Sequence, residues 1–142
     1  MKVCGVELKG NEAIICLMSL SDGLIDLPDC RVRRLTLIDV YSSEQLAEFQ
    51  FAFAKLMEDY KVDKVVIRQR PTKGKFAGSA NGFKMEAAIQ LIDSLEVETL
   101  SATEIKELLS YNPLPIPFSS TGLKGFQESA FTTAFASISR KK

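Results

Sequence analysis

The sequence predicts a single α/β domain built on a mixed β-sheet, and three observations lead to this prediction. The chain has 142 residues, which suits one domain with a core of its own. Its composition, 46% apolar and 25% charged, is that of an ordinary globular protein and excludes disorder. Three strand-like segments come first, and two further strands are each reached through a helix. We expect the domain to cover residues 1–139, followed by a basic tail at 140–142.

The first three strands are predicted at residues 2–8, 12–20 and 32–39. The first two are joined by a tight turn at Gly10 and Asn11, and an irregular stretch containing Pro28 precedes the third. Short connections of this kind favour antiparallel pairing. The start of the chain is therefore predicted to be an antiparallel meander.

The next elements are predicted to be a helix and a buried strand. Ser42, with Gln45 three residues later, is typical of a helix start, and apolar residues then recur at helical spacing as far as Tyr60. The continuous apolar run in residues 64–68 indicates a strand covered on both faces. A helix of this length returns the chain to the same end of the sheet, so this strand should lie parallel to a central strand at 2–8.

The remainder of the chain supplies a second helix, a fifth strand at residues 96–100 and two more helices. Ser101 and Glu104 form a capping box at the start of the third helix, and alanines and phenylalanines up to Ile138 mark the closing helix. The predicted architecture is a mixed five-stranded sheet, with three antiparallel meander strands, two parallel strands and helices on both faces.

Two residue types restrict the possible chemistry. The chain has no histidine, which excludes Ser-His-Asp triads, Cys-His dyads and Cys/His zinc sites. Its three cysteines have no C-x-x-C spacing. The N-terminal segment contains Glu7 and Lys9, unlike a signal peptide, and no apolar run approaches membrane-spanning length. We expect a cytoplasmic protein with no membrane partner and no organic cofactor.

The charge is zero overall but unevenly distributed. Residues 64–84 contain six basic residues and no acidic one. Four of them, Arg68, Arg70, Lys73 and Lys75, lie where the fourth strand opens into a Gly-rich loop. In an open α/β sheet this is the edge at which ligands bind. The segment is either a site for nucleic-acid phosphates or a solvated loop that keeps the protein soluble.

Several stretches resemble a known fold family. They are Gly5-Val6-Glu7-Leu8, Lys61-Val62-Asp63-Lys64, Phe83 to Ala88, Val97 to Lys106 and Glu128 to Ala136. Together with the element order they resemble the ribonuclease H-like fold, and specifically RuvC, the Holliday-junction resolvase. Over nearly its full length the chain also resembles a bacterial family known as domain of unknown function 3010, which implies no activity.

The ribonuclease H-like resemblance implies a metal site. In that superfamily, carboxylates from the first strand, the fourth strand and the last helix hold two Mg²⁺ or Mn²⁺ ions that cleave a phosphodiester. Glu7 matches the first acid and Glu128 lies near the last. The fourth strand reads Arg68-Gln69-Arg70 where an acid is expected. Glu86 could project toward the same region.

Each of these carboxylates also has a plainer interpretation. Glu7 could be a solvated residue near the end of its strand, and Glu86 an ordinary surface glutamate. Glu128 could simply complement the dipole of the last helix from its first turn. The sequence leaves these alternatives open.

Three functional hypotheses follow. The first is a nucleic-acid-binding domain that uses Arg68, Arg70, Lys73 and Lys75 and has a weakened or lost metal site. The second is an active metal-dependent phosphodiesterase in which Glu7, Glu86 and Glu128 form the carboxylate set. The third is a non-catalytic interaction module that forms a homodimer. Helical spacing must leave at least one of the phenylalanines 49, 51 and 53 exposed, and an exposed Phe51 would suggest such a contact.

Overall fold

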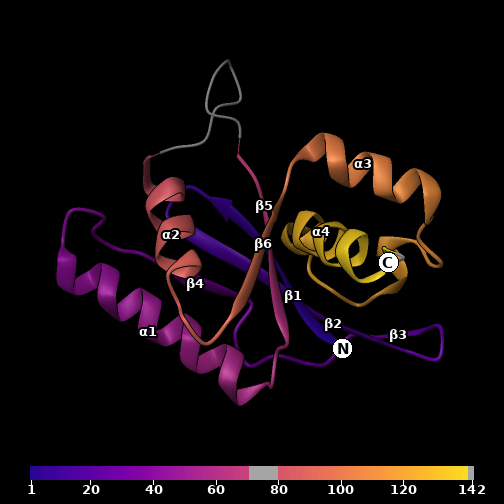
Figure 1. The fold of residues 1–142 in the computed structure, drawn as a ribbon, viewed down its shortest axis with the longest axis horizontal. Helices are drawn as coiled ribbons and strands as arrows, with labels where there is room; N and C mark the ends of the chain where they lie inside the picture. The colour runs from indigo at the N-terminus through magenta and orange to yellow at the C-terminus, as the bar shows by residue number, and fades with distance from the viewer. Residues whose placement is uncertain (71–79, 141–142) are drawn as a thin grey trace.

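The computed structural model describes residues 1–70 and 80–140 (Figure 1). The elements, in chain order, are β1 (Lys2–Lys9), β2 (Glu12–Ser21), β3 (Leu24–Asp26), β4 (Arg34–Thr36), α1 (Ser43–Asp59), β5 (Lys64–Arg68), α2 (Ala80–Gln90), β6 (Glu96–Leu100), α3 (Ala102–Tyr111), two short 3₁₀ turns η1 (Phe118–Ser120) and η2 (Gly125–Gln127), and α4 (Glu128–Ile138).

The strands form one mixed sheet in the order β3-β2-β1-β5-β6, and β4 pairs with β2 as well. β1 is antiparallel to β2 and parallel to β5, with Val3 opposite Lys64 and Val6 opposite Ile67. β6 adds to β5 in parallel. The prediction of a central first strand paired in parallel with the strand after the first long helix is confirmed.

The outer part of the meander differs from the prediction. The expected strand at 32–39 is a strand only over Arg34–Thr36, and a short strand at Leu24–Asp26 was not predicted. The described residues therefore form a sheet of six strands where five were predicted. A tight turn at Asp22 and Gly23, both with positive φ, reverses the chain after β2. Strands of three residues are too short to show a clear alternation of apolar and polar residues.

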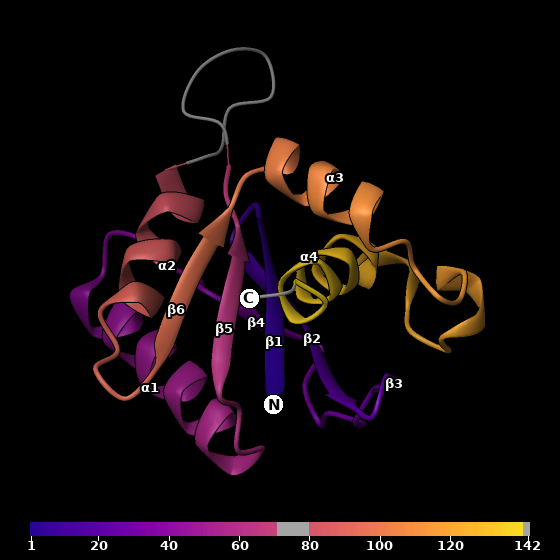
Figure 2. The same ribbon diagram turned by 45° about the vertical axis from the view of Figure 1, so that its right-hand side comes forward.

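Helices cover both faces of the sheet, as predicted. α1 and α2 lie on one face and α3 and α4 on the other (Figures 1 and 2). Ser42 accepts a hydrogen bond from the Gln45 backbone N–H at the start of α1, and Ser101 and Glu104 form the predicted reciprocal capping box of α3. Within the described ranges no helix is long and apolar enough to cross a membrane.

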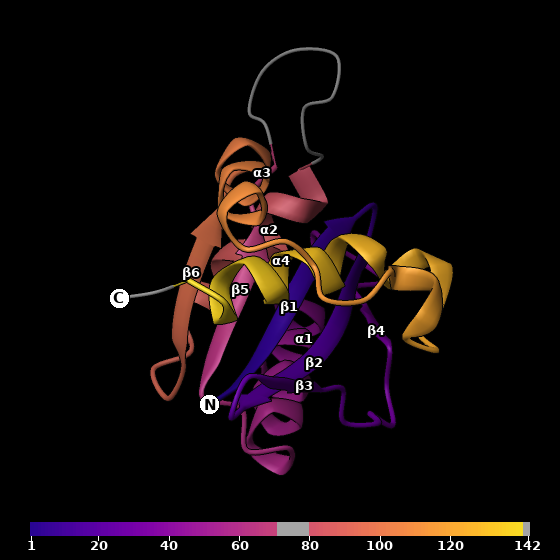
Figure 3. The same ribbon diagram turned by 90° about the vertical axis from the view of Figure 1, so that its right-hand side faces the viewer.

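The α4 helix crosses the middle of the sheet in close contact with β1 (Figure 3). Gly5 makes this approach possible, because a Cβ atom there would collide with the Ala130 carbonyl oxygen and lie 2.8 Å from the Ala134 Cβ. At the start of α4, the buried Gln127 side chain donates a hydrogen bond of 3.0 Å to the Ile15 carbonyl. These two contacts fix the beginning of α4 over β1 and β2.

The three cysteines differ in their exposure to solvent. Cys4 and Cys16 are buried, Cys30 is partly buried, and all three are free thiols. Burial, the largest cause, raises the pKa of Cys16 to about 12, so this thiol stays protonated and unreactive at neutral pH.

Candidate functional site

The candidate site lies on the α4-covered face of the sheet, toward the carboxyl ends of β1 and β5. The parallel register pairs Val6 with Ile67, so the next residues, Glu7 and Arg68, occupy neighbouring positions. Side chains alternate between faces along a strand, and Gly5 packs against α4, so Glu7 projects toward the α4 side. Arg68 shares this face with Val66, which packs in a cluster with Ala136 of α4.

Two of the four predicted phosphate-binding residues can be placed. Arg68 and Arg70 are half-buried, and no acidic side chain of residues 1–70 or 80–140 forms an ion pair with either. Gln69 is exposed and its backbone N–H donates to the Leu100 carbonyl at 2.8 Å, which extends the pairing of β5 with β6. Lys73 and Lys75 lie outside the described residues. Neither guanidinium is therefore held in an ion pair with the described residues, although Glu7 lies at the strand position beside Arg68.

The other predicted carboxylates occupy separate elements. Glu128 is exposed in the first turn of α4. Glu86 lies in α2 and is half-buried. Its Oε2 atom is shielded from solvent and accepts no hydrogen bond from residues 1–70 or 80–140, and burial raises the pKa of this carboxyl. In the described part of the chain, no three Asp, Glu or Cys side chains are grouped so that they could hold a metal ion.

The residues at this edge do not fit a two-metal site. Such a site needs several carboxylates in contact with the same pair of ions. Here the strand position beside Glu7 carries the guanidinium of Arg68, which repels a divalent cation. From the sequence, the fourth-strand acid of the superfamily was expected at Arg68 or just after it. Of these two positions only Arg68 lies on the same face as Glu7, because Gln69 faces the opposite side of the sheet.

A charged cluster that sequence analysis missed lies at the opposite end of β5. Glu98 accepts hydrogen bonds from Lys64 Nζ at 3.0 Å and from Arg140 at 2.5 and 2.6 Å. Burial raises the pKa of Glu98, but its hydrogen bonds and attraction to the two cations outweigh burial, and the pKa is lowered. The three residues are far apart in the chain, so no local sequence motif predicts that they are in contact.

A second group of cations was also not singled out from the sequence. Arg31, Arg33 and Arg34 come within four residues, just before and within β4. Together with Lys124 and Phe126, from the segment before α4, they line a groove of about 380 Å³. The close spacing of the three arginines could have indicated a cationic site. It was overlooked because residues 32–39 were predicted to be a strand.

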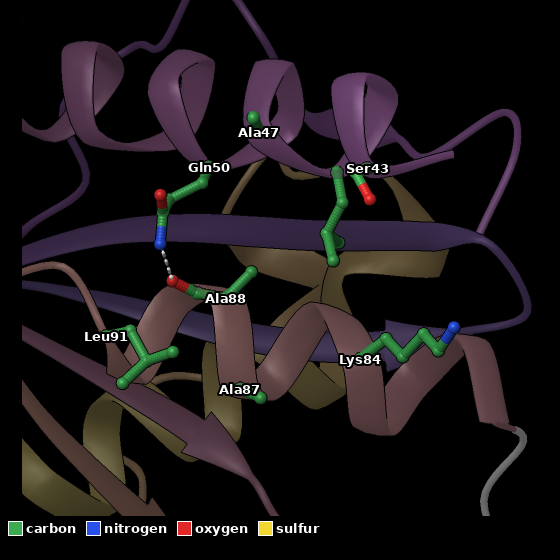
Figure 4. Close-up of a pocket in the computed structure, with 8 residues that line it drawn as sticks. Ser43, Ala47, Gln50, Lys84, Ala87, Ala88 and Leu91 are labelled. Carbon is green, nitrogen blue, oxygen red and sulfur yellow. Dashed lines mark hydrogen bonds between the residues drawn. The ribbon is translucent and has the colours of Figure 1, made fainter. Parts of the chain in front are cut away.

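The other side of the molecule carries an apolar groove between α1 and α2, with a volume of about 370 Å³ (Figure 4). Gln50 of α1 bridges the helices by donating to the Ala88 carbonyl at 2.8 Å, and Leu91 is 73% exposed. Phe51, also on α1, is 72% exposed, as expected, whereas Phe49 and Phe53 are buried. A homodimer through the exposed Phe51 remains a prediction.

Comparison with solved structures identifies the fold. The chain is similar to RuvC of Thermus thermophilus, with a TM-score of 0.72 and 10% identity over 96% of this chain and 92% of that one. It is also similar to T. thermophilus RuvC in complex with a Holliday junction substrate, with a TM-score of 0.64 and 8% identity over 96% and 91% of the two chains. The predicted ribonuclease H-like fold of the RuvC type is confirmed.

Comparison at the level of sequence is consistent with the resemblance stated above. No curated protein matches the chain. A family model does match it, over residues 1–137, under the description "Protein of unknown function (DUF3010)". Because this match covers nearly the whole sequence, the chain belongs to that family.

Proposed function

We propose that this protein binds the phosphate backbone of nucleic acid at the carboxyl ends of β1 and β5, through Arg68 and Arg70, and that Lys73 and Lys75 add to this contact. The observation that carries the proposal is the unneutralised charge at this edge: neither Arg68 nor Arg70 has an acidic partner in the described residues. Half-buried guanidinium groups suit phosphate because they offer several donors in one plane.

The fold supports the same proposal. One of the similar solved structures is a RuvC bound to a Holliday junction substrate. In open α/β sheets, ligands bind outside the carboxyl ends of the strands, which is where Arg68 and Arg70 lie. Contacts of this type recognise the backbone rather than the bases, so little sequence preference is expected.

A salt titration tests the proposal. The double variant Arg70→Ala/Lys73→Ala should weaken binding to single and double strands alike, and each lost phosphate contact should lower the salt slope by about one unit. The control is Lys61→Asn, which removes an exposed charge from the other end of the molecule; asparagine suits position 61 because Lys61 has a φ of 55°. If the wild type shows no salt-dependent binding at low ionic strength, the proposal is wrong.

We further propose that the metal site of the superfamily is weakened or lost in this chain, because a guanidinium occupies the position next to Glu7. The purified protein should then show little or no Mg²⁺-dependent cleavage of nucleic acid. Arg68→Glu should create Mn²⁺ binding in a calorimetric titration, whereas Gln69→Glu should not, since position 69 faces the other side of the sheet. Robust cleavage by the wild type that disappears in Glu7→Gln would contradict this proposal.

A further inference from the structure

The groove between β4 and the segment before α4 carries free positive charge beside an aromatic ring. Its lining residues are Arg31, Val32, Arg33, Arg34, Lys124 and Phe126. Arg31 is neutralised by Asp59 at 2.7 Å, and Arg34 lies 3.5 Å from Glu12. Arg33 and Lys124 are exposed and form no ion pair with any acid of the described residues.

The aromatic ring is already paired with a guanidinium. Arg34 stacks over Phe126 with its Cζ atom 4.9 Å from the ring centroid. Phe126 is nevertheless 38% exposed and the Arg34 side chain 52% exposed, so solvent reaches the stacked pair. An accessible flat surface of this kind, next to free cations, is what an unpaired base needs for stacking.

The strand registers connect this groove to the proposed phosphate site. Arg34 is opposite Ile14, Ile14 is opposite Glu7, and Glu7 is beside Arg68. The four residues therefore form one row across β4, β2, β1 and β5, with side chains on the face that α4 covers. Three strand spacings of about 4.8 Å separate the backbone positions of Arg34 and Arg68, about 14 Å in all. Ile14, in the middle of the row, is buried against α4, so a nucleic-acid strand that joins the two sites has to pass around the start of α4.

We propose that this groove binds an unpaired nucleotide of a nucleic-acid strand whose neighbouring phosphates lie on Arg68 and Arg70. The base stacks on the Arg34–Phe126 pair, and Arg33 and Lys124 contact the flanking phosphates. This inference rests on the proposed function and adds the substrate class: strands with unpaired bases, in preference to fully paired duplex. Three acids adjoin the groove: Asp59, which pairs with Arg31; Glu12, which lies near Arg34; and the exposed Asp29, which lines the adjoining cavity with Arg33.

Binding measurements on a single strand and on a blunt duplex of the same sequence test the inference. Phe126→Leu should weaken single-strand binding on the order of 10-fold, the effect of losing one stacked base, and should change duplex binding little. Phe126→Tyr keeps the ring and should bind as the wild type does. Phe51→Leu, at the exposed phenylalanine of α1, is the matched control. Lys124→Ala should lower the salt slope for the single strand by about one unit.

A fluorescent base gives a second readout. A single 2-aminopurine in the strand should change its fluorescence on binding to the wild type and to Phe126→Tyr, and should respond less to Phe126→Leu. If Phe126→Leu and Lys124→Ala both bind the single strand like the wild type, while Arg70→Ala/Lys73→Ala binds it weakly, the inference is wrong and the proposed function stands. If the wild type binds neither strand form, both are wrong.

Discussion

β5 carries one cation near each of its ends on the face covered by α4, and only one of the two forms an ion pair with the described residues. Lys64, at the amino end, has only 14% of its side chain exposed and lies 3.0 Å from Glu98, which also holds Arg140. Arg68, at the carboxyl end, is half-buried beside Glu7 without forming an ion pair within the described residues. The same strand thus contains one cation that is paired with a carboxylate and one that has no ion pair within the described residues.

The difference lies in whether a half-buried cation has an acidic partner in the fold. A half-buried cation without a counter-charge loses part of its hydration and gains little in return. At Lys64 the carboxylate of Glu98 offsets this cost, and the cluster also connects the residues after α4 to β6. At Arg68, under the proposed function, a bound phosphate would offset this cost. The following variants test whether the two cations differ in their effects on stability and on binding.

The largest effect is expected for Glu98→Gln. The change leaves Lys64 and Arg140 facing a neutral amide, so the free energy of unfolding at neutral pH should fall by about 2 kcal/mol. Urea unfolding measures it, with Glu48→Gln, an exposed glutamate of α1, as the control. Equal stability of Glu98→Gln and the wild type would show that the cluster contributes nothing.

The pH dependence of this effect has a defined sign. Because the pKa of Glu98 is lowered in the folded protein, its contribution is present above the unfolded pKa of about 4.3 and is lost as the pH falls through the folded value. The difference in stability between the wild type and Glu98→Gln should therefore shrink in acid. A difference that stays constant down to the acid transition would contradict the assignment.

An intermediate effect, on binding rather than on stability, is expected for Arg68→Ala. Without an ion pair to lose, the variant should unfold within about 0.5 kcal/mol of the wild type. Its affinity for nucleic acid should fall several-fold, with a salt slope lower by about one unit. Lys64→Ala is the matched change at the other end of β5 and should do the reverse, lowering stability and leaving binding unchanged. Equal destabilisation by both would remove the contrast.

The smallest effect is expected for Glu86→Gln. Burial raises the pKa of this carboxyl, so the ionised form opposes folding, and stability falls as the pH rises from the unfolded value through the folded one. The variant should gain at most about 0.5 kcal/mol at neutral pH, because water still screens part of the charge, and nothing near pH 4. Thermal unfolding at the two pH values measures this. A loss of stability at neutral pH would mean that ionised Glu86 has a stabilising partner.

The sequence by itself determined the order of the main elements and the pairing of the central strands. Capping residues such as Ser42 and Ser101, the tight turn at Gly10, and the apolar run of β5 act over a few residues, and local patterns of this kind persist in the fold. The parallel neighbourhood of β1 and β5 followed from the length and hand of the helical crossover. For the same reason Glu7 and Arg68 could be expected near each other, and the register places them at neighbouring strand positions.

Only the tertiary structure decided which charges meet. Lys64, Glu98 and Arg140 are 34 and 42 residues apart in the chain, and their contact depends on the register of β5 with β6 and on where α4 ends. The position of Arg34 over Phe126 likewise depends on β4 pairing with the far side of β2. Strand register and helix docking are set by the packing of the whole core, so a neutralised cation and a free one look alike in the sequence.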